Sequence, residues 1–460
     1  MKPITIPNIS IPTIGIPTIG IPSVGFPSAS GGGGLSWPAG MKEHIKAWYD
    51  PKKQGMTNFD VIESYADDFT KWKIENTGVT STQKKIVIAA GTELKYNVTY
   101  KGFGNSIAEF DIKYTGNAVI RYQYNKEDGT TGIITINRSG IYHLPASIKA
   151  QKNFGFYCNP QTVTEEATIE QLPTSILKDF SGNGNHAYLY GGKGKLNSGM
   201  GLYKVDFTSW RKSSVQTEVK PDVVKVTPNT SDYLFIQYAN SVEIPSYKIK
   251  VIGLGDNVLK YQYATENGRK EINIVEGENE LPTSIKVSND YQIGYRLTPG
   301  TSVFTITQIP DYPDQLCYDG KMYAVCYGFP ILTDYTVMAE RTWFEIGDNS
   351  CFASKRIGAN KGAFAIEYRK LYAENFGLYN AITFVANKKE IIVQSKEKYN
   401  DKDLIAGNEI DTNQLLIGGI SLNNNRLNEP YIGCHGTIIV ADRSFTEEEI
   451  NWLKQNWDKI

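Results

Sequence analysis

Apolar and polar residues alternate in short runs along most of the chain, as they do in β-strands that bury one face. Ile120, Tyr122 and Tyr124, for example, are separated by the polar residues Arg121 and Gln123. Glycine-containing turns such as NKEDG and ATENG follow these runs, and turns of this kind join antiparallel strands. The pattern therefore predicts an all-β protein built from many short strands.

One module occurs twice in the chain, which indicates two domains of the same fold. Five short motifs recur in the same order, with offsets of 137 to 139 residues. They are 68–72 with 206–210 (DFTKW and DFTSW), 122–124 with 261–263 (YQY), 144–149 with 281–286 (LPASIK and LPTSIK), 155–156 with 294–295, and 171–173 with 308–310. We therefore predict two homologous small β-sandwich modules, at 68–173 and 206–310.

Three segments of the chain lie outside the two modules. They are residues 41–67, 174–205 and 311–460. The first contains AWYD (47–50), the second contains LKDFSGNGNH (177–186), and the third ends in RSFTEEEI (443–450) and a short tail. In this order the motifs resemble the laminin-G-like, concanavalin-type jelly rolls, and the resemblance covers these segments but neither module. It implies one jelly-roll sandwich that the two modules interrupt.

The end of the third segment predicts a helix that closes the jelly roll. Thr446 and Glu449 have the spacing of a capping box, in which each residue binds a free backbone N–H of the other. Ile450, Leu453 and Trp457 then recur on one face of the helix. We expect that face to pack against the sheet.

Residues 1–34 form an N-terminal arm with a proline at every fifth position and a final GGGG, so a helix is excluded. Its apolar side chains follow one slowly winding stripe of an extended chain. They are Ile6, Ile9, Ile11, Ile14, Ile16, Ile19, Ile21, Val24 and Phe26. One stripe cannot bury itself, so we predict that copies of the arm wind together or that the arm docks in a partner's groove. The alternative is a flexible spacer.

Two neighbouring stretches, WYDPKKQGMTN (48–58) and DVIESY (60–65), resemble structural proteins of crAss-like and related bacteriophages of gut Bacteroides. The resemblance implies a virion protein, assembled in the bacterial cytoplasm, that serves as a fibre, spike or decoration of the head or tail. Its arm would bind other virion proteins. We expect a homo-oligomer, with a trimer favoured, and lectin-like domains that bind a host surface polysaccharide. The alternatives are a bacterial surface or secreted carbohydrate-binding protein, and a structural spacer without a ligand.

Composition excludes several other classes of protein. Lys plus Arg is 48 and Asp plus Glu is 49, so the chain lacks the positive charge of a nucleic-acid binder. No run approaches the roughly 20 apolar residues of a membrane-spanning helix. The five cysteines are odd in number and contain no C-x-x-C pair, which predicts buried free thiols.

Catalytic chemistry is not expected. Glucanases among the jelly-roll relatives carry an E-x-D-x-x-E strand, whereas this chain has Glu409, Asp411 and then Gln414 in the third position. The pair of carboxylates that glycoside hydrolysis needs is therefore incomplete. No other catalytic motif is present, so we predict that the protein is not an enzyme.

Two sets of residues are weak candidates for binding. Tyr122 and Tyr124, with their repeats Tyr261 and Tyr263, would form a sugar-stacking platform or, alternatively, a half-buried cross-strand aromatic ladder. Calcium is a common cofactor of the family that the jelly-roll segments resemble. Its candidate ligands are Asp179, Asn183 and Asn185. A turn held by these same side chains is the simpler interpretation, so no cofactor is required.

Overall fold

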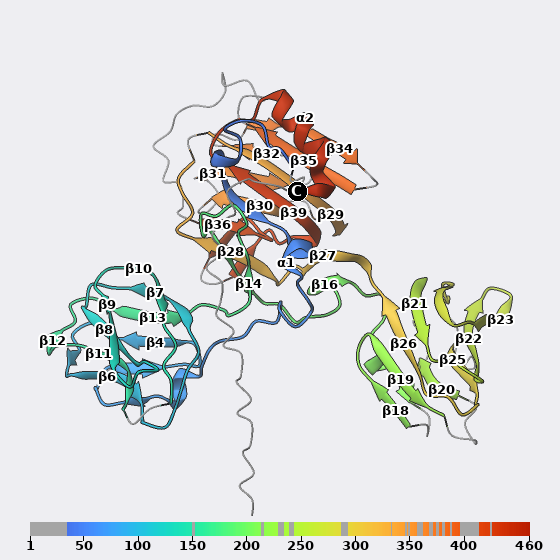
Figure 1. Ribbon diagram of the computed structural model, residues 1–460, viewed down its shortest axis with the longest axis horizontal. Helices are drawn as coiled ribbons and strands as arrows, with labels where there is room; N and C mark the ends of the chain where they lie inside the picture. Colours follow the sequence, from blue (N-terminus) through green and yellow to red (C-terminus); the bar gives the residue numbers. More distant parts are fainter. Residues whose placement is uncertain are drawn as a thin grey trace, which may run out of the picture.

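The computed structural model confirms an all-β protein with three lobes (Figure 1). It describes residues 35–149, 152–212, 216–228, 234–238, 243–286, 293–332, 334–345, 347, 350–356, 362–367, 371–373, 377–379, 382–386, 389–395, 414–423 and 426–460. The arm residues between Ile6 and Phe26, and the pair Glu409 and Asp411, lie outside this set. Predictions about them therefore stay predictions.

A jelly-roll sandwich of two sheets forms the largest lobe. The first sheet has the order β16 (Gly199–Leu202), β27 (Asp311–Asp319), β39 (Ile432–Ala441), β29 (Thr336–Glu345), β35 (Lys389–Ser395) and β34 (Ile382–Ala386), and β1 (Ile45–Tyr49) also pairs with β39. The second sheet has the order β14 (Ile176–Leu177), β15 (Ala187–Tyr190), β28 (Tyr323–Tyr327), β36 (Gln414–Ile417), β30 (Cys351–Arg356), β31 (Gly362–Glu367), β32 (Leu371–Ala373) and β33 (Gly377–Tyr379).

One apolar core joins the two sheets of the jelly roll. Val337 and Val440 of the first sheet meet Leu189 and Ile417 of the second, and all four are fully buried. A separate hairpin pairs β37 (Ser421–Asn423) with β38 (Arg426–Asn428). All five cysteines of the protein lie buried as thiols, as predicted. In the described part of the chain, no helix is long and apolar enough to span a membrane.

The first module is a sandwich of two five-stranded sheets around its own core. One sheet has the order β10 (Gly140–Leu144), β7 (Phe110–Thr115), β13 (Ala167–Gln171), β4 (Lys85–Ile88) and β3 (Val79–Ser81). The other has the order β2 (Lys73–Ile74), β6 (Asn97–Lys101), β11 (Phe154–Tyr157), β8 (Ile120–Asn125) and β9 (Thr131–Ile136). A small ribbon pairs β5 (Glu93–Leu94) with β12 (Gln161–Thr162).

The second module repeats this strand order, as expected of a second copy of the same fold. One sheet has the order β24 (Gly277–Leu281), β21 (Tyr247–Ile252), β26 (Phe304–Ile309), β19 (Val223–Thr227) and β18 (Gln216–Val219). The other has the order β17 (Arg211–Lys212), β20 (Leu234–Tyr238), β25 (Ile293–Thr298), β22 (Val258–Thr265) and β23 (Gly268–Ile274).

The repeated motif DFT-x-W forms the same short turn where the chain enters each module. Asp68 caps the 3₁₀ turn η2 (Phe69–Lys71) by accepting a hydrogen bond from the Thr70 backbone N–H. Asp206 does the same for η3 (Phe207–Ser209). Phe69 and Phe207, the residues after each cap, are fully buried in their modules.

The repeated glutamine at the end of each module ties its exit to its entrance. Gln171 accepts a hydrogen bond from the Asp67 backbone N–H at 3.1 Å and donates one to the Asp67 carbonyl at 2.7 Å. Gln308 likewise accepts from the Val205 N–H at 3.1 Å and donates to the Val205 carbonyl at 2.8 Å. We call this paired contact the glutamine clasp. It fixes the two linkers of each module side by side.

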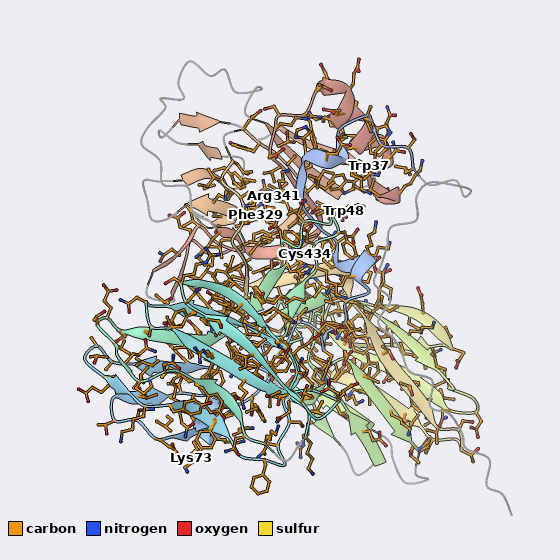
Figure 2. The ribbon with its side chains drawn as sticks, turned by 60° about the vertical axis from the view of Figure 1, so that its left-hand side comes forward. Trp37, Trp48, Lys73, Phe329, Arg341 and Cys434 are labelled. Carbon is orange, nitrogen blue, oxygen red and sulfur yellow. The ribbon has the colours of Figure 1, made fainter. Side chains whose placement is uncertain are left out.

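The closing helix is α2 (Glu447–Asn456), followed by the turn η6 (Trp457–Lys459). The predicted capping box between Thr446 and Glu449 is present. The predicted apolar face also packs on the outer side of the first sheet, against Trp48, Met338 and Ile439. Trp37, just after the arm, lies beside Trp48, with ring centroids 5.7 Å apart (Figure 2). The ring centroid of Trp452 is 4.9 Å from that of Trp37.

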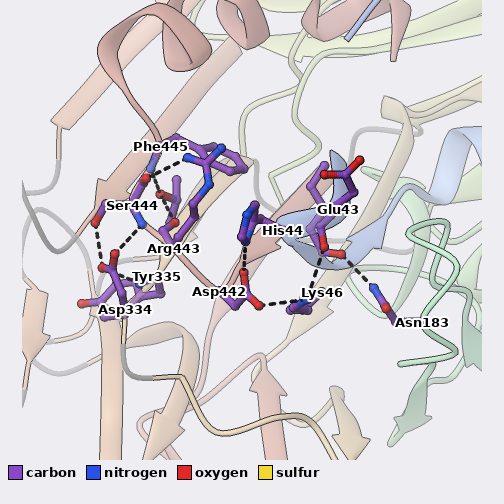
Figure 3. Close-up of polar contacts among 12 residues, drawn as sticks. Glu43, His44, Lys46, Asn183, Asp334, Tyr335, Asp442, Arg443, Ser444 and Phe445 are labelled. Carbon is purple, nitrogen blue, oxygen red and sulfur yellow. Dashed lines mark hydrogen bonds and ion pairs between the residues drawn. The ribbon is translucent and has the colours of Figure 1, made fainter. Parts of the chain in front are cut away.

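Both ends of the described chain meet on this sheet, because β1 pairs with β39. Asp442 binds His44 at 2.7 Å and Lys46 at 2.8 Å (Figure 3). His44 belongs to the 3₁₀ turn η1 (Lys42–His44), and β1 leads into the one-turn helix α1 (Pro51–Gln54). The start of β1 is therefore held to the end of β39 by side chains as well as by backbone pairing.

Candidate functional site

The structure overturns the interpretation of the Tyr-x-Tyr pairs as exposed sugar platforms. Tyr122 and Tyr261 are fully buried in the module cores, where burial raises the pKa of both phenols. Tyr124 and Tyr263 pack partly buried beside them, with ring centroids 6.0 and 6.2 Å from their partners. These rings form the half-buried aromatic ladder that was the alternative, because the strand period places both tyrosines of each pair on the core face.

The three candidate calcium ligands take part in holding a turn. The Asp179 carboxylate accepts hydrogen bonds from the backbone N–H groups of Trp48, Ser181 and Asn185 at 2.8 to 3.0 Å. Asn183 and Asn185 donate their side-chain N–H groups to carbonyls of β1, at 2.8 and 2.7 Å. These side chains lock the SGNGNH turn onto β1, which is the simpler of the two interpretations. Across the residues that the structure describes, no three His, Cys, Asp or Glu side chains gather as a metal site.

A cleft on the outer face of the first jelly-roll sheet is the best candidate for a binding site. Its volume is about 670 Å³, which lies within the roughly 300 to 1,000 Å³ of small-molecule sites. The cleft lies between α1, the start of β27, the middle of β29 and β39, and the turn η6. Its lining residues are Asp50, Lys52, Lys53, Tyr312, Pro313, Asp314, Gln315, Glu340, Thr342, Gly436, Thr437, Trp457, Asp458 and Ile460.

A buried glutamate and a glutamine form the floor of this cleft. Glu340 of β29 is only 4% exposed and accepts a hydrogen bond from the side-chain amide of Gln315 on β27. The strand between them, β39, has Gly436 at this level. A Cβ atom there would lie 2.7 Å from a carboxylate oxygen of Glu340. Because Gly436 has no side chain, the carboxylate of Glu340 can occupy this space.

A second buried carboxylate borders the floor. Asp50, which is 7% exposed, caps α1 by accepting a hydrogen bond from the Lys53 backbone N–H at 2.8 Å. Its other oxygen accepts a hydrogen bond from the Thr437 hydroxyl at 3.1 Å. The cap that starts α1 thus also fixes an acidic group at the edge of the cleft.

Two lysines of α1 form one wall. Lys52 makes an ion pair with Asp314 at 3.0 Å, and this hydrogen bond raises the pKa of the lysine. Lys53 places its ammonium 3.9 Å from the centre of the Trp48 ring, and burial lowers its pKa. Both ammonium groups therefore already have a partner within the protein.

Aromatic rings form the remaining walls. Tyr312 is 37% exposed and lies beside Phe344, with ring centroids 5.6 Å apart. Its φ of 56° puts the backbone in the left-handed region, which is unusual for a residue with a large side chain. Trp457 is 4% exposed, and its indole N–H has no acceptor in the described part of the chain. The cleft thus combines hydrogen-bonding groups with aromatic surface.

The sequence motifs already included four residues of this cleft, which are Asp50, Lys52 and Lys53 in WYDPKKQGMTN (48–58) and Trp457 on the closing helix. The sequence contains one signal that could have identified Glu340 as part of the site. It follows the apolar run YTVMA (335–339), and a carboxylate at a buried strand position is rare unless it is paired or functional. Gln315 and Thr437 carry no such signal, because polar residues at their positions are ordinary in exposed strand faces.

Comparisons with known proteins identify no family. No family model and no curated protein matches the chain. Among solved structures, the tandem CBM22 domains of Xyn10C from Paenibacillus barcinonensis are 10% identical, cover 54% of this chain and 96% of that one, and give a TM-score of 0.15. Vicilin from Corylus avellana (hazelnut) is 7% identical over 52% and 83% of the two chains, with a TM-score of 0.14. At TM-scores this low, we draw no inference from these similarities.

Proposed function

We propose that this protein is a non-catalytic virion component, a fibre, spike or decoration protein of a bacteriophage, whose jelly roll binds a saccharide of the host surface. The cleft between α1, β27, β29 and η6 carries the binding half of the proposal. Carboxylates and the Gln315 amide offer acceptors and donors to sugar hydroxyls, and aromatic rings offer flat apolar surface to the C–H faces of a sugar.

The architecture supports a role in display. Two sister modules extend from one jelly roll, and the same glutamine clasp holds each of them at its base. Trp37 packs on Trp48 and Trp452, so the chain just after the arm is tied to the face that carries α2. An arm that docks on a particle would connect the particle to this aromatic cluster.

A saccharide panel tests the binding half. The full-length protein is titrated with purified capsular polysaccharides of candidate Bacteroides hosts. We expect binding by the wild type and a roughly tenfold loss in Tyr312→Ala, equal to about 1.4 kcal/mol. Tyr96→Ala is the matched control, because Tyr96 is a 57% exposed tyrosine of the first module and lies outside the cleft. We expect this control to bind like the wild type.

The outcomes of these experiments distinguish the proposed functions. Binding that survives Tyr312→Ala would contradict the cleft as the site. Absence of binding to every polysaccharide of the panel would favour a structural spacer without a ligand.

Labelling with an antibody against this protein tests the virion half of the proposal. We expect the antibody to label purified phage particles. If the antibody instead labels the envelopes of bacteria that carry no phage, a bacterial carbohydrate-binding protein would be favoured.

A further inference from the structure

The cleft is more acidic than the chain as a whole. Four carboxylates line it, those of Asp50, Asp314, Glu340 and Asp458, against the two ammonium groups of Lys52 and Lys53. The local balance is therefore −2, whereas the whole chain of 460 residues has a net charge of only −1. Because opposite charges attract over short range, a cationic ligand is favoured in this space over an anionic one.

Each lysine of the wall has a partner of its own. Lys52 is held by Asp314 at 3.0 Å, on the wall, and Lys53 lies over the Trp48 ring at 3.9 Å. Glu340 at the floor and Asp50 at its border are both already more than nine-tenths buried. Their desolvation has occurred on folding, so an incoming ammonium group gains charge-assisted hydrogen bonds without removing further water from them.

A hydrogen-bond donor without an acceptor lies in the same cleft. The indole N–H of Trp457 is buried and has no partner in the described part of the chain. Buried donors of this kind are rare in native proteins, and each is a candidate for contact with a ligand. A sugar hydroxyl oxygen is a suitable acceptor, whereas an ammonium group is not. The ligand that satisfies both the floor and the indole therefore carries an amine and hydroxyls together.

We infer that the cleft selects an amino sugar with a free ammonium group, and this inference rests on the saccharide-binding role proposed above. The ammonium group lies against Glu340 at the floor, and a ring hydroxyl accepts the Trp457 N–H. Uronic acids and phosphorylated sugars are rejected, because their negative charge meets Glu340, Asp50 and Asp458.

A matched pair of oligosaccharides tests the amine directly. Isothermal titration of the full-length protein compares a glucosamine hexamer, its fully N-acetylated counterpart and a galacturonic acid hexamer, at low salt and at a pH where the free amine is protonated. We expect the glucosamine hexamer to bind at least tenfold more tightly than its acetylated form, and the uronic acid hexamer not to bind. Raising the salt concentration is expected to weaken the binding of the glucosamine hexamer.

Variants tie this preference to the cleft. Glu340→Gln keeps the shape of the floor and removes its charge, so the tenfold preference for the free amine should disappear. Asp458→Asn gives an independent check at an exposed position where folding is not at risk, and it should weaken glucosamine binding severalfold. Trp457→Phe should weaken the free and the acetylated hexamers alike. Glu93→Gln, at an exposed position of the first module, is the control that should change nothing.

Different results would contradict the amino-sugar inference and the saccharide-binding role. Equal binding of the free and acetylated hexamers, or a preference that survives both Glu340→Gln and Asp458→Asn, would overturn the amino-sugar inference while the saccharide role stands. Binding of none of these hexamers and of no capsular polysaccharide would overturn the saccharide role itself. Binding of a lysine-rich peptide in place of saccharides would show that the cleft recognises protein amines, which also overturns the inference.

Discussion

His435 shows how one buried side chain makes stability depend on pH. It lies on β39 in the jelly-roll core, where its Nε2 contacts the Tyr318 hydroxyl at 3.0 Å and its Nδ1 contacts the Gly436 carbonyl at 2.7 Å. Burial lowers its pKa to about 4. The folded protein therefore keeps this imidazole neutral at a pH where the unfolded chain protonates it.

We predict that the jelly roll loses stability between about pH 6.5 and pH 4 because of His435. Only the unfolded state takes up the proton in this range, so the free energy of unfolding falls as the pH falls, by roughly 2 to 3 kcal/mol for this group. Urea denaturation at neutral and acidic pH measures the loss. His435→Gln should be less stable at neutral pH but should show a shallower pH dependence. An unchanged slope in this variant would contradict the prediction.

Asp179 is a second single residue with a large expected effect. Its carboxylate accepts hydrogen bonds from three backbone N–H groups, of which one belongs to Trp48 on β1. We predict that Asp179→Ala lowers the free energy of unfolding of the jelly roll by about 3 kcal/mol, since hydrogen bonds to charged groups contribute about 1.5 to 3 kcal/mol each. Denaturant titration measures the change. Ser181→Ala, which keeps the backbone donors, should cost much less.

Calcium gives an independent test of how the SGNGNH turn is held. Because Asn183 and Asn185 turn their amide N–H groups toward β1, we predict the same melting temperature in excess calcium and in excess chelator. A ligand that binds only the folded state raises the melting temperature. A rise with calcium that Asp179→Ala abolishes would restore the calcium site.

At the scale of elements, the glutamine clasp explains why the same glutamine recurs at the end of each module. Gln171 and Gln308 are almost fully buried and reach back to the linker where their modules begin. A strand end that only closed a sheet would need no such residue. The repeated Asp-capped turn and the repeated glutamine together form a base that both modules use.

We predict that Gln171→Ala destabilises the first module and leaves the second unchanged, and that Gln308→Ala does the reverse. Each substitution leaves two backbone groups without this partner, partly buried ones at Asp67 and buried ones at Val205. A buried group left without a partner costs about 1 to 3 kcal/mol. Differential scanning calorimetry measures the shift of each module's transition. Gln123→Ala, at a half-exposed position of β8, should have little effect. Equal shifts of both transitions would show that the modules do not unfold independently.

At the scale of the whole molecule, the two modules attach to the jelly roll differently. The first module contacts the outer face of the second jelly-roll sheet, where Asp111 accepts a hydrogen bond from the Tyr188 hydroxyl at 2.8 Å. Lys113 also lies 5.0 Å from the centre of the Tyr327 ring, and Ile141 packs on the same aromatic cluster. The corresponding strands of the second module, β21 and β24, place Lys248 opposite Glu280. The same position in the two modules therefore carries different side chains, Asp111 in the first and Lys248 in the second.

We predict that deletion of residues 1–34 abolishes oligomerisation and particle binding while the body keeps its melting temperature. The arm contributes the apolar stripe from Ile6 to Phe26, whereas the aromatic cluster around Trp37 stays intact. Light scattering and calorimetry on the full-length and shortened proteins measure the two properties. Oligomers of unchanged size after the deletion would show that assembly depends on other surfaces.

The sequence by itself determined the features that depend on spacing along the chain. The period of two predicted the strands, the five repeated motifs predicted sister modules, and Thr446 with Glu449 predicted a capping box that the structure confirms. All of these are local, because a strand period, a turn or a helix cap involves residues a few positions apart. The same local rules could not tell that Tyr122 is buried while Tyr124 is only partly so.

Only the tertiary structure decided where the cleft lies and what lines it. Asp50, Gln315, Glu340 and Thr437 come from segments that are as much as 387 residues apart, and they meet because β1, β27 and β29 all pair with β39. Strand order is set by how apolar faces pack across the whole sandwich, which no local pattern encodes. Gly436 gains its meaning in the same way, since its missing side chain matters only where Glu340 lies beside it.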